Sequence, residues 1–247
     1  MTQELIKFWD EAPLTEYPYI HPQDKENLDG RVFLPPIKTF DEYQAALRER
    51  RMRKPGYQVS LLPLPYVGDV VNARFVILML NPGLSANDFY VEHHVPEFRD
   101  NLLATIRQTR ATHMFLDPKW AWTTAFGWWH GKVRRLVGEL SERKFDNNYG
   151  RALDLLAREV ACIELVPYHS VSFTGKLNLA STTAARSAAQ AIAKDSGRTL
   201  IVTRSVKAWN LPDQPNVIKY TGGETRSASL GPNSKGGKAI LDLLLSS

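Results

Sequence analysis

Hydrophobic residues cluster into short blocks separated by longer mixed segments, and this pattern is clearest after residue 70. Four blocks are apolar and rich in β-branched residues, as strands covered on both faces should be: 74–80, 160–166, 199–203 and 216–220. Helical segments lie between and after them: 130–143, 149–159, 179–197 and 236–247. Alternating strands and helices predict an α/β fold with a mainly parallel sheet between helical layers.

Residues 1–60 have a different character, with Pro-rich turns and one helix candidate at 39–54. Thr39 is a suitable N-cap for this helix. Its last turns carry a run of cations: Arg48, Arg50, Arg51, Arg53 and Lys54. These cations either complement the helix macrodipole or form a patch that contacts phosphate. We expect residues 1–60 to be an N-terminal extension packed on a core domain of residues 61–247.

Polar breaks follow the carboxyl ends of two predicted strands. The first strand runs into Asn81-Pro82-Gly83, and the second runs into Pro167-Tyr168-His169-Ser170. In open α/β sheets, ligands bind beyond the carboxyl ends of strands where the topology switches. The first break can simply start a helix capped by Ser85 or Asn87, or it can aim the Asn81 side chain into a cleft.

Composition narrows the class of protein. The chain has 247 residues, a net charge of +5 and a sequence pI near 9.3, with six Trp and nine Tyr. Cations bind phosphates and flat rings stack on bases, so a basic chain rich in aromatic residues suits a polyanionic partner. Enzymes with acidic substrates have the same composition. The first residues are no signal peptide, and no apolar run approaches the roughly 20 residues of a membrane helix. We therefore expect a cytoplasmic protein without a membrane partner.

The sequence lacks the motifs of several familiar enzyme classes. The chain has no Walker loop, no GxGxxG after a strand and no GxSxG elbow. The single cysteine, Cys162, excludes an internal disulfide, a Cys-based zinc site and the zinc deaminase signature. His93 and His94 are adjacent, and adjacent side chains on a regular element point apart. We therefore expect no metal and no cofactor.

The polar breaks and their neighbours resemble one family. "VILMLNPGLS" is similar to the first active-site motif of the uracil-DNA glycosylase superfamily, closest to its mismatch-specific branch. Four other segments stand in the order of that family: "PLPYVGDVVNARFVILMLNPG", "AFGWWHGKVRRLVGEL", "CIELVPYHS" and "LIVTRSVKAW". The resemblance covers roughly residues 62–245. It implies a three-layer α/β/α fold with a central, mainly parallel four-stranded sheet, and a monomeric DNA glycosylase.

The resemblance assigns roles to two of these positions. An enzyme that acts on a base must take it out of the stack and hold it in a pocket that also places water at the sugar. Asn81 matches the residue that orients this water, and the alternative is a turn former. Because an amide is a poor base, the barrier would fall mainly through electrostatic stabilisation of an oxocarbenium-like transition state. Phe126 matches the ring that stacks on the base, with Trp128 and Trp129 as competitors.

Glu164 departs from the family. Uracil-reading members place Asn at this point of the strand, where an amide both donates and accepts. A carboxylate only accepts, so it suits the exocyclic amino group of cytosine and opposes the O4 of uracil. The alternative is a structural carboxylate paired with a buried Arg or capping a helix. His169 follows the strand and would stabilise the leaving base or contact a phosphate, unless it is simply a loop histidine.

Two further departures concern the loops. The segment "YTGGETRSASLGPNSKGG" lacks the family's second tripeptide motif, which leaves Arg226, Ser227, Ser229 and Asn233 as candidates for the second catalytic group. The residues that we expect to contact DNA are Ser85, Arg226, Asn233, Ser234 and Lys235. The Gly, Ser and Lys content of this segment suits a loop whose N–H groups and Lys235 bind a phosphate at the start of the last helix, and the alternative is a solvated loop before a capped helix. The insert at 88–124 is longer than in compact members and suits a bulkier base, and its Tyr90 is a candidate base contact.

The main hypothesis is therefore a monofunctional DNA glycosylase that leaves an abasic site. Glu164 and the insert favour a modified cytosine, such as a hydroxymethylated or glucosylated base of phage DNA excised as defence. Uracil or mismatched thymine in genome repair is the alternative substrate. Two other classes stay open, a non-catalytic nucleic-acid-binding module and an enzyme on free nucleosides.

Overall fold

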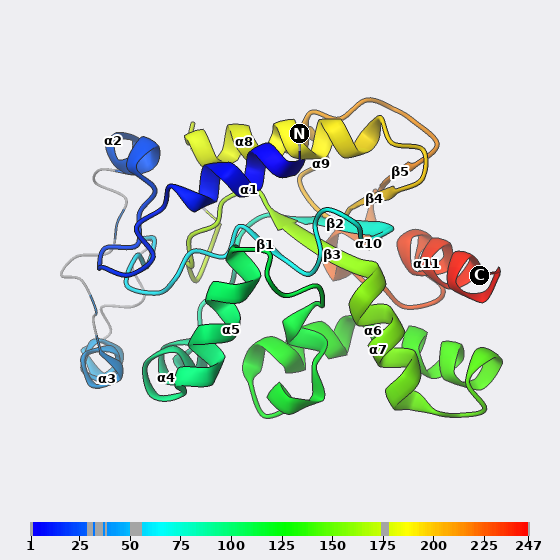
Figure 1. Ribbon diagram of the computed structural model, residues 1–247, viewed down its shortest axis with the longest axis horizontal. Coiled ribbons are helices and arrows are strands. Elements are labelled where there is room, and N and C mark those ends of the chain that lie inside the picture. The colour runs from blue at the N-terminus through cyan, green and yellow to red at the C-terminus, as the bar shows by residue number, and fades with distance from the viewer. Residues whose placement is uncertain are drawn as a thin grey trace. The chain divides into compact units, whose positions relative to one another are not determined.

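The computed structural model describes residues 2–28, 32, 37, 39–49, 56–173 and 178–246 (Figure 1). The chain forms two compact units, and each unit is built from three separate segments. Unit 1 comprises Met1–Tyr66, Leu80–Arg110 and Glu164–Ala188. Unit 2 comprises Val67–Met79, Ala111–Ile163 and Ala189–Ser247. The two polar breaks at residues 81–83 and 167–170 therefore both belong to unit 1.

Unit 2 contains nearly all of a five-stranded sheet with the order β1-β3-β2-β4-β5. Its strands are β1 (Tyr66–Val67), β2 (Phe75–Met79), β3 (Val160–Glu164), β4 (Thr199–Val202) and β5 (Val217–Lys219). The pairs β2–β4 and β4–β5 are parallel. Every residue of β2 and β3 is buried, which explains why these strands are apolar rather than alternating, apart from Glu164 at the end of β3.

The helices of unit 2 follow the strands. They are α6 (Thr124–Lys144), α7 (Tyr149–Glu159), α9 (Val206–Trp209), α10 (Gly223–Ser227) and α11 (Lys235–Ser246). The long helix α6 packs against both α7 and α11 (Figure 1). Two glycines permit close packing in this unit. A Cβ on Gly68 would lie 2.6 Å from the Val160 carbonyl oxygen, and one on Gly237 would lie 2.0 Å from that of Gly231.

Unit 1 is mainly helical. Its helices are α1 (Thr2–Asp10), α2 (Lys25–Leu28), α3 (Phe40–Arg48), α4 (Ala86–His94), α5 (Pro96–Ile106) and the first part of α8 (Ala180–Ala193). Helix α4 packs against both α3 and α5. The α3–α4 contact is apolar, and its centre is the Tyr43 ring stacked on Phe89 with ring centroids 4.3 Å apart.

The predicted α/β class is confirmed, and the four predicted strand segments form β2 to β5. The sheet has five strands rather than four, because Tyr66–Val67 adds a two-residue strand at the edge beside β3. The helix predicted at 130–143 begins earlier, at Thr124, since the Thr123 side chain caps it by accepting from the Phe126 N–H at 3.2 Å. Among the described residues, no helix is both long and apolar enough to cross a membrane.

The basic helix in the N-terminal segment is described only in part. Thr39 caps α3 as predicted, accepting from the Glu42 N–H at 3.2 Å. Helix α3 ends at Arg48. The other predicted phosphate-contacting cations lie outside the described residues: Arg50, Arg51, Arg53 and Lys54.

Candidate functional site

Asn81 is held in a defined orientation at the start of the first polar break. Its side-chain Nδ2 donates to the Pro82 carbonyl at 2.8 Å and to the Ser170 hydroxyl at 2.9 Å. A carbonyl oxygen can only accept, so the Pro82 contact fixes which end of the amide is nitrogen. Within the described part of the chain, no donor reaches the Asn81 side-chain carbonyl oxygen. Asn81 is half-buried, and its carbonyl oxygen is available to accept a hydrogen bond from water.

Ser170 is the residue that sequence analysis did not single out. It is buried, and its hydroxyl accepts from Asn81 while donating to the Ser172 carbonyl at 2.9 Å. The Ser170 N–H also points to the Pro82 carbonyl at 3.4 Å. In the sequence, the only sign of a role for Ser170 was its place in the second polar break. The fold shows that hydrogen bonds join the two breaks. The amide of Asn81 is thus fixed by a loop that lies 89 residues further along the chain.

His169 is oriented by the same pair of loops. Its Nδ1 lies 2.8 Å from the Gly83 carbonyl oxygen, which can only accept, so Nδ1 carries the proton. In the neutral ring Nε2 is then an acceptor, and it becomes a donor only in the imidazolium. The His169 backbone carbonyl accepts from the Gln58 N–H at 2.8 Å. Asn81 and His169, the two predicted catalytic residues, therefore lie on loops that are hydrogen-bonded to each other.

The loop that carries His169 and Ser170 is anchored by a buried polar network. The Tyr168 hydroxyl donates to Asp24 at 2.8 Å and accepts from the His21 N–H at 3.1 Å. Asp24 also accepts from the Ser181 N–H at 3.0 Å. Burial and the Asp24 carboxylate raise the pKa of Tyr168 well above its ordinary value, so the phenol stays a donor. The N-terminal segment thus supports the candidate site directly.

Glu164 ends β3 and is 8% exposed. Its N–H donates to the Pro65 carbonyl at 2.9 Å, and two residues later the Val166 N–H donates to the Leu80 carbonyl at 2.9 Å. Glu164 is thus buried, and the segment that follows it is hydrogen-bonded to Leu80, the residue before the first polar break. Whether its carboxylate reads a base stays a prediction.

Ser85 and Tyr90 belong to the same part of unit 1. Ser85 is the N-cap of α4, and it forms a reciprocal capping box with Asp88. The Ser85 hydroxyl donates to the Asp88 carboxylate at 2.9 Å and accepts from the Asp88 N–H at 3.3 Å. Tyr90 is 43% exposed, and its ring lies 5.3 Å from Phe40 and 5.1 Å from His94. The cap explains Ser85 structurally, and Tyr90 is exposed enough to meet a ligand.

Phe126 and its competitors lie in unit 2, on the first turns of α6. Phe126 is 8% exposed, and its ring stacks on His130 at 5.2 Å with an interplanar angle of 17°. Trp129 is buried and meets the His113 ring edge to face. Trp128 is 44% exposed. Of the three rings, Trp128 offers the most surface to an incoming base, whereas one face of Phe126 is already covered.

Exposed Trp128 adjoins a group of cations in unit 2. The Lys132 ammonium lies 5.0 Å from the Trp128 ring centroid and donates to the Ser227 carbonyl. Arg204 donates to the Arg226 carbonyl at 3.0 Å. Burial and then the charge of Arg204 lower the pKa of Lys132. We call Trp128, Lys132, Arg204 and Arg226 the basic–aromatic surface.

The C-terminal loop leads into α11 through a capped helix start. The Ser234 hydroxyl accepts from the Gly237 N–H at 3.0 Å and donates to the Gly231 carbonyl at 2.8 Å. The Glu224 carboxylate accepts from the Lys235 N–H at 3.2 Å and lies 3.4 Å from its ammonium. Asn233 is exposed. A carboxylate of the chain thus occupies the place that the sequence assigned to a phosphate at this helix start.

Metal ligands do not gather in the described part of the chain. No group of three or more His, Cys, Asp or Glu side chains there could hold a metal ion. His93 and His94 lie on α4, where their rings contact different aromatic neighbours. Burial and then the charge of Arg99 lower the pKa of His93.

The structure places the predicted site residues in two groups. Asn81, Ser85, Tyr90, Glu164 and His169 belong to unit 1, whereas Phe126 and the loop residues Arg226, Asn233, Ser234 and Lys235 belong to unit 2. Comparison with protein-family models, with curated proteins and with solved structures finds no match to this chain.

Proposed function

We propose that the protein is a monofunctional DNA glycosylase, which flips a base out of the stack and hydrolyses its N-glycosidic bond to leave an abasic site. The observation that supports this most is the orientation of Asn81. Two hydrogen bonds fix its amide nitrogen, at 2.8 Å and 2.9 Å, and leave its carbonyl oxygen to water. A side chain that served only as a turn former would not need an anchor from a distant loop.

Asn81 would hold the attacking water by accepting one of its protons in a hydrogen bond. An amide cannot remove that proton at neutral pH, so the rate would come from positioning and from electrostatic stabilisation of the oxocarbenium-like transition state. His169 would act on the leaving base. Because its Nδ1 is committed to Gly83, only Nε2 can meet the base, and it donates a hydrogen bond only as imidazolium.

We infer a modified cytosine as the substrate, excised from phage DNA as defence. The carboxylate of Glu164 would accept from the exocyclic amino group and repel a carbonyl oxygen at the same place. Uracil or mismatched thymine is the alternative, and in that case Glu164 is structural.

The basic–aromatic surface supports DNA as the partner. Trp128 offers an exposed ring for stacking with the Lys132 ammonium 5.0 Å from its centroid, and Arg204 is hydrogen-bonded to the backbone of Arg226. Stacking on aromatic side chains together with cation contacts to the backbone is the usual way to hold a displaced strand. The three-layer, mainly parallel arrangement implied by the family resemblance is part of this proposal.

The decisive experiment offers the protein a set of DNA oligonucleotides that differ in one base. The set contains uracil, a thymine mismatch, 5-hydroxymethylcytosine and glucosylated hydroxymethylcytosine, and alkali-labile sites report base release. Asn81→Ala should reduce the rate about a hundredfold or more while DNA binding changes little. Asn87→Ala, a substitution in the first turn of α4 on the same segment, is the control and should retain activity. Base release by Asn81→Ala at the wild-type rate would remove this residue from the mechanism.

A non-catalytic nucleic-acid-binding module is the second candidate. The basic–aromatic surface can bind DNA without any chemistry, and Glu224 already occupies the start of α11, where a bound phosphate was expected. DNA binding without abasic sites on any of the tested bases would favour this module over the enzyme.

A further inference from the structure

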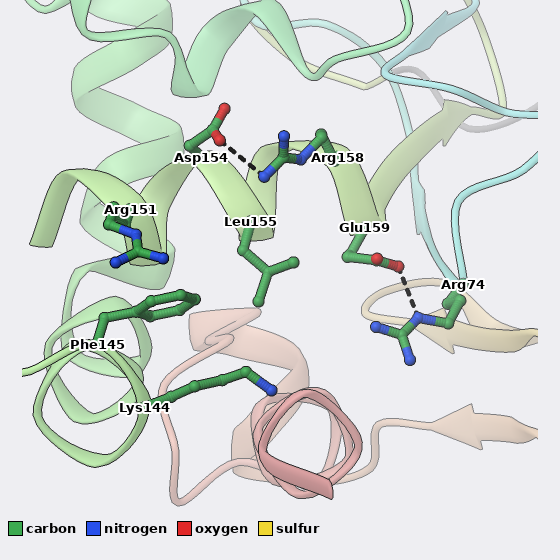
Figure 2. Close-up of a pocket in the computed structure, with 8 residues that line it drawn as sticks. All are labelled: Arg74, Lys144, Phe145, Arg151, Asp154, Leu155, Arg158 and Glu159. Atoms are coloured by element: carbon green, nitrogen blue, oxygen red, sulfur yellow. Dashed lines mark hydrogen bonds and ion pairs between the residues drawn. The ribbon is translucent and has the colours of Figure 1, made fainter. Parts of the chain in front are cut away.

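Outside the candidate site, unit 2 contains a pocket of about 390 Å³ (Figure 2). It is lined by Arg74, Lys144, Phe145, Arg151, Asp154, Leu155, Arg158 and Glu159. Arg74 directly precedes β2 and Glu159 directly precedes β3. The pocket therefore lies where these strands begin, whereas the polar breaks of the candidate site follow the other ends of the same strands.

Positive charge is in excess in this pocket. Four lining residues are cations and two are carboxylates. Each carboxylate is already matched, because Arg158 pairs with Asp154 at 2.8 Å and Arg74 pairs with Glu159 at 2.7 Å. Lys144 and Arg151 add two charges that no carboxylate of the lining balances.

The two unbalanced cations are held in place by contacts other than ion pairs. The Lys144 ammonium donates to the Leu244 carbonyl at 2.8 Å, which uses one of its three protons. The Arg151 guanidinium lies over the Phe145 ring, 5.2 Å from its centroid. A guanidinium stacked on a ring keeps its N–H donors at the edge, where they can meet an acceptor. No carboxylate in the described ranges forms an ion pair with Arg151.

We propose that this pocket binds a phosphate group. Its cations come from three segments and approach from different sides, in the loop before β2, at the end of α6 and along α7 (Figure 2). A tetrahedral dianion can accept from several directions at once, whereas a planar carboxylate is satisfied by a single arginine fork. An excess of two positive charges also matches a phosphate dianion. This site requires no base excision, so it stands apart from the proposed glycosylase activity.

The phosphate can be free or part of a DNA backbone, and two measurements on the full chain separate these sources. The first measures the binding of inorganic phosphate by the rise of the thermal midpoint at constant ionic strength. The second measures the salt dependence of binding to a labelled single-stranded DNA oligonucleotide. Each lost contact to a backbone phosphate should lower that slope by about 0.7.

The test variant is Arg151→Gln, and Arg143→Gln is its matched control. Arg143 carries the same charge and lies next to Lys144 at the end of α6, but it pairs with Glu139 at 3.1 Å and does not line the pocket. Arg151→Gln should weaken phosphate binding about tenfold or more, since a charge-assisted contact is lost, while Arg143→Gln leaves it unchanged. Arg151→Lys keeps the charge and should bind at an intermediate level, which separates loss of the site from misfolding.

The outcomes identify the source. Loss of phosphate binding together with a lower salt slope would identify the backbone of DNA, and loss of phosphate binding alone would identify a free phosphate or a small phosphorylated ligand. If wild-type protein gains no stability from phosphate and Arg151→Gln leaves the salt slope unchanged, the pocket is only a surface ion-pair cluster and the proposal fails.

Discussion

The hydrogen bond between Tyr168 and Asp24 should be one of the main supports of unit 1. Both side chains are fully buried, and the bond joins residues 144 positions apart. Tyr168→Phe removes a donor to a carboxylate, which is worth about 1.5–3 kcal/mol, and leaves the His21 N–H without its acceptor. We therefore expect the free energy of unfolding to fall by about 2–4 kcal/mol. The similar shape of phenylalanine keeps the packing loss small.

Denaturant unfolding measures this loss, and hydrogen exchange locates it. Because the chain has two compact units, a single unfolding transition cannot be assumed. Faster exchange should appear in peptides that cover residues 18–28 and 167–173, which the hydrogen bond connects. Tyr149→Phe is the control, since the Tyr149 hydroxyl bonds to His130 at 2.7 Å on the exposed surface and should contribute less than about 1 kcal/mol. A loss below about 0.5 kcal/mol for Tyr168→Phe, with unchanged exchange, would refute the supporting role.

Three further outcomes follow from other side chains. Glu164→Asn should shift base release from cytosine derivatives toward uracil, by roughly 1–3 kcal/mol of discrimination, and wild-type excision of uracil alone would contradict the inferred substrate. Glu224→Gln should raise affinity for DNA and steepen its salt dependence, because it frees the Lys235 ammonium 3.4 Å away; Lys235→Ala should instead lower the salt slope by about one unit. Burial raises the pKa of Glu92 from its ordinary value of 4.5 to about 7, although the Leu62 N–H and the charge of Arg99 act to lower it. Glu92 should thus stabilise the fold below about pH 4.5, and up to about 3 kcal/mol of this stabilisation should be lost as the pH rises through 7. Unfolding of the wild type and of Glu92→Gln, each measured at pH 4.5 and at pH 8, would test this.

The sequence alone determined the α/β class and the identity of the main elements. Strand β2 and residues Val160–Ile163 of β3 are short, apolar and largely β-branched, and a strand buried on both faces has little other choice of composition. Helix α7 matches its predicted bounds, since Asn148 caps it and Glu159 ends it before an apolar strand. Thr39 and Ser85 were recognisable as caps for the same reason. These features depend on residues close together in the chain, so local patterns reveal them.

The tertiary structure decided what depends on distant partners. Ser170 became part of the candidate site because its hydroxyl meets Asn81 from the second polar break. Asp24 became its support because it meets Tyr168. In the same way, Glu224 meets Lys235 and takes the place expected for a phosphate. A hydrogen bond between residues far apart leaves no periodic trace in a sequence, because its partners become neighbours only when the chain has folded.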